Sequence, residues 1–167
     1  ILIAHQWGAN SPSFKRLKVD RQPWISRIVE LLPTITDRPI IFRTHPNDYP
    51  DAVERCKKRF RDLDHGRIRY VHGASEPFGK SLEDCHAVVA FDSGALTDAA
   101  IEGIPVFVGG ISMADAVANH DLHRIENPIL PDRTPWAWWL AWAQWQQAEM
   151  RKGLPWKYLV EQWGTFQ

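Results

Sequence analysis

The sequence has few cysteines, no long apolar run and no excess of charge of either sign. Cys56 and Cys85 are its only thiols and have no Cys-x-x-Cys spacing, so neither a disulfide framework nor a cysteine-based zinc site is expected. Its apolar runs are far shorter than the roughly 20 residues of a membrane-spanning helix. Lysine plus arginine and aspartate plus glutamate each number 20, a balance that does not indicate nucleic-acid backbone binding. We therefore expect a cytoplasmic globular protein without a bound metal.

Three common catalytic signatures are also missing. There is no Gly-x-x-x-x-Gly-Lys loop, and no Gly-x-Gly-x-x-Gly follows the first apolar segment. This argues against a P-loop nucleotidase and against a simple dinucleotide-dependent oxidoreductase. Ser93 does not stand in a Gly-x-Ser-x-Gly elbow, so a hydrolase nucleophile is not expected there.

Short apolar segments alternate with amphipathic segments along most of the chain. Such alternation predicts an α/β domain, Rossmann-like and three-layered, with a mainly parallel five-stranded sheet. Pro33 is expected to end the first helix, and Ser81 to begin a short one with a capping box. The predicted strands are 1–4, 39–43, 67–71, 87–91 and 104–108, and the predicted helices include 23–32, 51–63 and a segment between Gly94 and Gly103.

The C-terminal part is rich in tryptophan. Seven of the nine tryptophans lie between Pro135 and Trp163, on two predicted helices that break near Gly153-Leu154-Pro155. Helices that are apolar on several faces are normally buried, and tryptophan is enriched at interfaces. We therefore divide the chain into a Rossmann-like domain, 1–128, and a helical extension, 129–167, which packs on that domain or on a partner. Because Ile1 already lies in a strand pattern, we expect the chain to be part of a longer polypeptide.

The segment from Ala87 to Val108 carries the most functional information. A buried strand pattern leads directly into Asp92-Ser93-Gly94, which supplies an N-cap side chain and a flexible backbone at a helix start. Free N–H groups and the helix dipole attract anions at such a position. Gly103 fits a left-handed C-cap after the helix. The pattern predicts a phosphate-binding turn, although an ordinary βαβ unit with a well-capped helix has the same signature.

Ligands of open parallel sheets bind beyond the carboxyl ends of the strands, so the polar residues that follow each strand form one set. Histidine and arginine donate to phosphate oxygens, and glycine lets backbone N–H groups approach a ligand. The set can therefore hold a phosphorylated ligand. It comprises His5, Gln6, Trp7, Gly8, Asn10, Ser11, Arg43, Thr44, His45, Pro46, Asn47, His72, Gly73, Ser75, Glu76, Asp92, Ser93, Gly94, Gly109, Gly110 and Ser112.

Four motifs together resemble a known family. They are Arg43-Thr44-His45-Pro46, Ser81-Leu82, Phe91-Asp92-Ser93-Gly94-Ala95, and the run from Ala99 to Val106. The combination resembles the C-terminal, donor-binding domain of GT-B glycosyltransferases, above all the capsule polysaccharide and CDP-glycerol transferase type and the glycosyltransferase-like proteins of phages. The resemblance covers residues 39 to about 128.

The resemblance implies transfer of a sugar or related group from a nucleotide-diphosphate donor, with no tightly bound cofactor. It implies that His45, Ser93 and Gly94 bind the diphosphate, to which the chemistry of Arg43 adds a fourth candidate. The ribose candidates are Glu102, which its place before Gly-x-Pro favours, and Asp98. This superfamily usually keeps its catalytic base in an N-terminal acceptor domain, which we expect as a partner, with a homodimer through the tryptophan-rich tail as the alternative. Within this chain, His5 is the candidate base.

Two other interpretations stay open. Thr44-His45-Pro46-Asn47 and Asp92-Ser93-Gly94 are also similar to UDP-N-acetylglucosamine 2-epimerases. The residues that follow, Ala95-Leu96-Thr97 and Gly109-Gly110-Ile111, depart from the pattern of that family. The other interpretation is a binding or scaffold domain that has the fold without the chemistry. A nucleic-acid acceptor is compatible with the likeness to phage proteins, but the charge balance does not indicate one.

Overall fold

The computed structural model describes residues 1–6 and 21–164, and of residues 21, 22 and 162–164 only the backbone. By its internal contacts the chain divides into two compact units, Ile1–Pro131 and Asp132–Gln167. The division lies three residues after the boundary that was expected from the sequence between 128 and 129.

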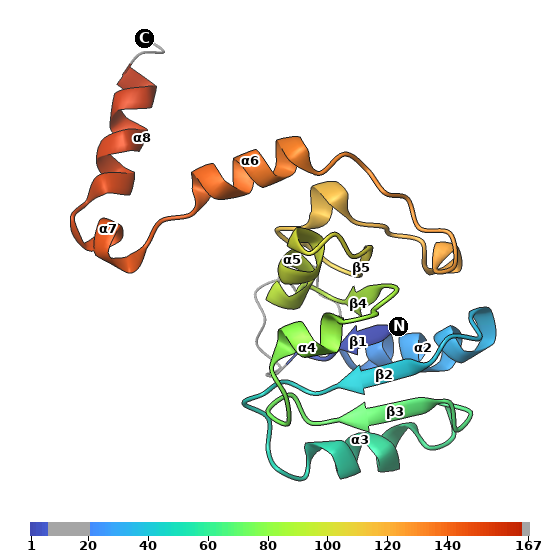
Figure 1. The fold of residues 1–167 in the computed structure, drawn as a ribbon. Coiled ribbons are helices and arrows are strands. Elements are labelled where there is room, and N and C mark those ends of the chain that lie inside the picture. Colours follow the sequence, from blue (N-terminus) through green and yellow to red (C-terminus); the bar gives the residue numbers. More distant parts are fainter. Residues whose placement is uncertain (7–20, 165–167) are drawn as a thin grey trace. The chain divides into compact units, whose positions relative to one another are not determined.

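The first unit contains a five-stranded sheet in which every strand pair is parallel (Figure 1). This confirms the predicted Rossmann-like α/β fold. The strand order is β3-β2-β1-β4-β5, so the direction of winding reverses between β1 and β4. Ligands of such sheets bind at that reversal. The strands are β1 (Leu2–Ala4), β2 (Ile40–Arg43), β3 (Ile68–Val71), β4 (Val88–Ala90) and β5 (Val106–Val108).

Helices cover both faces of the sheet. The connections through α2 (Arg21–Ile35) and α3 (Ala52–Phe60) run one way from β1. Those through α4 (Phe78–Leu82) and α5 (Gly94–Ile101) run the other way, and right-handed crossovers place them on the opposite face (Figure 1). Two 3₁₀ turns, η1 (Asp115–Val117) and η2 (Leu122–Arg124), follow β5.

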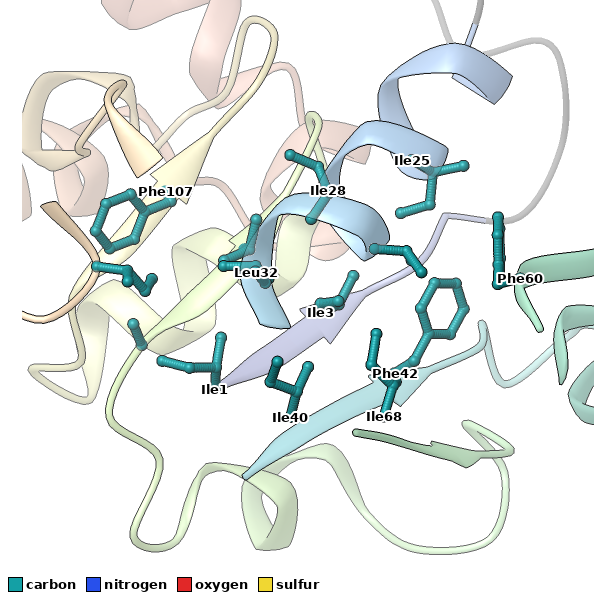
Figure 2. Close-up of a cluster of buried hydrophobic side chains, with 14 of the residues drawn as sticks. Ile1, Ile3, Ile25, Ile28, Leu32, Ile40, Phe42, Phe60, Ile68 and Phe107 are labelled. Carbon is teal, nitrogen blue, oxygen red and sulfur yellow. The ribbon is translucent and has the colours of Figure 1, made fainter. Parts of the chain in front are cut away.

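A cluster of buried hydrophobic side chains lies between the sheet and the α2–α3 layer (Figure 2). Ile28 and Leu32 of α2 and Phe60 of α3 pack against Ile3 and Phe42 of the two central strands. These side chains are at most 2% exposed, so their burial is the main hydrophobic contribution to stability on this face of the sheet.

Two predicted helix boundaries are wrong. Pro33 does not end α2, which continues to Ile35, because Leu32 is fully buried in the core and its carbonyl still accepts the N–H of Thr36 at 3.2 Å. Ser81 does not begin a helix but lies in the last turn of α4. Its hydroxyl accepts from Arg43 and donates to Glu76, and is therefore not used as a cap.

The second unit consists of α6 (Thr134–Ala143), α7 (Gln147–Arg151) and α8 (Leu154–Gly164). The predicted break at Gly153 is present, with a φ of 71°. A second break follows α6, where a capping box of Gln146 and Glu149 starts α7. Within the unit, Trp142 Nε1 donates to the Tyr158 hydroxyl at 2.9 Å, which ties α6 to α8. None of the described helices combines the length and apolarity needed to cross a membrane.

Gly73 lets the turns after β2 and β3 touch, and this close approach is testable. A Cβ at Gly73 would overlap the Thr44 carbonyl oxygen and lie 2.5 Å from Pro46 N. Gly73→Ala is expected to lower the free energy of unfolding by about 1–3 kcal/mol, the usual cost of overpacking. Urea denaturation followed by circular dichroism measures this change.

The matched control is Gly79→Ala in α4, where no described atom lies within 4 Å of the added methyl group. That variant is expected to be as stable as the wild type, or more stable by about 0.5–1 kcal/mol, because alanine is the better helix former. Equal stability of Gly73→Ala and the wild type would contradict the close approach of the two turns.

Candidate functional site

The reversal of strand order brings the turn after β1 beside the turn after β4. Gln6 Nε2 donates to Asp92 Oδ1, and the Asp92 N–H donates to Gln6 Oε1 at 3.3 Å. One side-chain amide therefore connects both turns at the place where ligands of this fold bind. Residues 7–11 of the first turn lie outside the described residues.

Ser93 is the N-cap of α5, as predicted. Its backbone is extended, with φ −69° and ψ 144°, and its hydroxyl accepts the N–H of Ala95 at 3.3 Å. The helix is anchored by Leu96, Ala99 and Ala100, which are at most 1% exposed. The first turn of α5 contains no acidic residue, so no carboxylate within that turn offsets the positive end of the helix dipole.

Gly94, the first residue of α5, is exposed. Its φ is outside the left-handed region, and no described atom lies within 4 Å of a Cβ built on it. Among the hydrogen bonds of the described residues, none uses its N–H. Neither backbone conformation nor packing within the described chain thus requires glycine here, whereas close approach of a ligand to the helix N-terminus would.

His45 lies in the turn after β2. Its Nδ1 accepts the N–H of Asn47 at 3.1 Å, and in the neutral ring this places the proton on Nε2, which can donate to a ligand oxygen. Strands β2 and β4 flank β1, so their ends are roughly 10 Å apart at the usual strand spacing.

Arg43 is buried, and its guanidinium holds the segment between β3 and α4. It donates to the carbonyls of Gly73 at 2.5 Å and Glu76 at 2.6 Å and to Ser81 Oγ at 2.7 Å. Glu76 Oε1 lies 3.7 Å from Nη1. Burial lowers the pKa of Arg43, and the Glu76 carboxylate opposes that shift. These contacts favour a structural role, and phosphate binding by Arg43 stays a prediction.

Asp98 and Glu102 do not lie at the turn that Ser93 caps. Both are exposed and line a groove between α4 and α5 that also contains Glu83 and Asp84. At 1.5 Å per helical residue, Asp98 is roughly 7 Å and Glu102 roughly 13 Å along the axis from Ser93. A ribose contact stays a prediction for both, and helix geometry favours Asp98.

His5, the candidate base, is half-buried, with its ring 5.2 Å from that of Phe42. The backbone N–H of His5 donates to the Arg43 carbonyl at 2.9 Å. His5 therefore lies at the carboxyl end of β1, between the turns after β2 and β4. His72, from the same sequence set, has its Nε2 3.3 and 3.2 Å from the carbonyl oxygens of Asp48 and Tyr49 and joins two turns. Within residues 1–6 and 21–164, no three histidine, cysteine, aspartate or glutamate side chains form a metal-binding group.

Sequence reasoning placed Gln6 and Asp92 in one set but did not foresee their pairing. The two residues are 86 positions apart, and no spacing rule relates them. The structural use of Arg43 was missed for the same reason, because its partners lie 30 to 38 positions further along the chain.

No protein-family model, curated protein or solved structure matches the chain.

Substitution of Arg43 separates a structural role from a ligand role. Arg43→Met is expected to lower the free energy of unfolding by about 3–5 kcal/mol, because the variant leaves buried carbonyls unpaired and the Glu76 carboxylate without its cation. The control is Arg61→Met at the exposed end of α3, which should change stability by less than about 0.5 kcal/mol. Urea denaturation measures both. Wild-type stability of Arg43→Met together with lost nucleotide binding would instead assign Arg43 to the ligand.

Proposed function

We propose that the first unit binds the diphosphate of a nucleotide-sugar donor at the N-terminus of α5, as the donor-binding half of a GT-B-type glycosyltransferase. The observation that carries this proposal is the start of α5 at the strand-order reversal. There Ser93 caps the helix, and Gly94 is exposed with nothing described above its Cα. The motifs shared with the glycosyltransferase family supply the substrate class.

The proposed chemistry is stabilisation of a leaving group. When the bond between the sugar and the diphosphate breaks, negative charge develops on the diphosphate oxygens. Fixed N–H groups at the helix start, the Ser93 hydroxyl and the Nε2 proton of His45 can stabilise that charge without a metal ion. The catalytic base would come from an acceptor domain or, within this chain, from His5.

Loss of either side chain should weaken donor binding. Ser93→Ala and His45→Ala are each expected to reduce the affinity for a nucleoside diphosphate by about 1–3 kcal/mol, the contribution of one charge-assisted hydrogen bond. Calorimetric titration with UDP, CDP, GDP and ADP measures the effect and identifies the base. Ser93→Ala also removes the helix cap, which costs about 0.5–2 kcal/mol of stability.

Gly94→Ala separates binding from folding. Because the methyl group meets no described atom and alanine favours helix, this variant should keep the wild-type melting temperature, yet it should bind the diphosphate more weakly. Gly79→Ala in α4 should neither lower the melting temperature nor weaken diphosphate binding. If no diphosphate binds the wild type, or if all three site variants bind as the wild type does, the site is misplaced and a scaffold role is favoured.

A further inference from the structure

A second cavity lies on the other face of the sheet from α5. It has a volume of about 390 Å³ and opens between α2 and the segment 120–123 that follows β5. This volume falls within the range of about 300–1,000 Å³ that is typical of small-molecule sites. All its lining residues belong to the first unit.

One wall of the cavity is a single stripe of α2. Trp24, Arg27 and Leu31 are spaced three and four residues apart and therefore project from the same side of the helix. The Trp24 indole is held on two sides. It lies directly over Gly109, where a Cβ would overlap the ring, and meets the Phe91 ring edge-on at 5.2 Å. The structure thus presents a fixed aromatic surface next to a guanidinium.

The opposite wall carries two imidazoles, His120 and His123. Asp121, a carboxylate on the same wall, caps η2, and its Oδ1 accepts the backbone N–H of His123 at 3.0 Å. The floor between the walls is apolar and includes Phe107 and Leu122. The cavity therefore combines an apolar floor with polar groups at its rim, as ligand sites do.

In the described lining of the cavity, Arg27 is the only lysine or arginine and Asp121 the only aspartate or glutamate. Arg27 takes part in none of the ion pairs formed by the described residues. His120 Nε2 lies 3.8 Å from Asp115 Oδ1, so this imidazole already faces a carboxylate of the chain. An unpaired guanidinium beside an aromatic wall suits an anion that carries a flat apolar group, because arginine binds carboxylate and phosphate oxygens through two parallel hydrogen bonds.

We propose that this cavity binds a small organic anion, with its aromatic or aliphatic body between Trp24 and the apolar floor and its phosphate or carboxylate at Arg27. The proposal does not depend on the diphosphate site, because the two sites use different helices on different faces of the sheet.

Phenyl phosphate is the probe, and calorimetric titration of the full chain is the measurement. The wild type is expected to bind it at one saturable site, at least tenfold more tightly than inorganic phosphate, which lacks the apolar body, or benzyl alcohol, which lacks the charge. Titration with benzoate then distinguishes carboxylate from phosphate ligands, because both anions fit the same guanidinium.

Arg27→Gln should weaken binding of phenyl phosphate at least fivefold. Its side chain is exposed and makes no ion pair in the described chain, so folding should be unaffected. The matched control Arg61→Gln should bind as the wild type does. Ser93→Ala should also retain binding, which distinguishes this cavity from the start of α5.

The proposal is overturned by wild-type affinity in Arg27→Gln, or by affinity for phenyl phosphate no greater than for inorganic phosphate. It is also overturned if Ser93→Ala abolishes binding, since the probe would then occupy the diphosphate site. Binding of phenyl phosphate without any binding of nucleoside diphosphates would support the anion site in the cavity and reject the proposed function. Failure of one proposal can therefore be distinguished from failure of the other.

Discussion

The pairing of β1 with both β2 and β4 is the constraint on which the rest of the first unit depends. Leu2 pairs with Ile41 on one side and with Val88 on the other, so a three-residue strand joins the two halves of the sheet. Because the connections diverge from β1, the strand order reverses between β1 and β4, at the position where ligands of such sheets bind. The Gln6–Asp92 pair then closes that edge.

Arg43 and Gly73 hold the turns after β2 and β3 together at the same edge of the sheet. Arg43 ends β2 and binds the backbone of Gly73 and Glu76, while the absence of a side chain at Gly73 lets the next turn contact Thr44 and Pro46. A buried cation with its donors engaged positions neighbouring groups but contributes little charge to a ligand. Within the proposed function, the anion would therefore be bound by His45 and the start of α5 and not by Arg43.

The two faces of the sheet differ in chemistry. On the α4–α5 face, side chains such as Asp98 and Glu102 make the groove between the helices acidic, and the proposed diphosphate site lies at the start of α5. On the α2 face, by contrast, Arg27 and the imidazoles of 120–123 surround an apolar floor. Backbone dipoles recognise compact anions such as diphosphates, whereas a guanidinium over an apolar cavity suits an anion with a hydrophobic body. The two proposed sites thus select different ligands.

The sequence alone determined the element types, the parallel sheet and the cap at Ser93, because these depend on local apolar patterns and on single residues such as Gly103, whose φ is 84°. It misjudged Pro33 and Ser81, where burial of Leu32 and the contacts of Arg43 override the local preference. Only the tertiary structure decided which polar residues meet. Gln6 and Asp92 are distant in sequence, yet parallel pairing makes them neighbours. Spacing predicts contacts within an element, whereas contacts between elements depend on the order in which strands assemble.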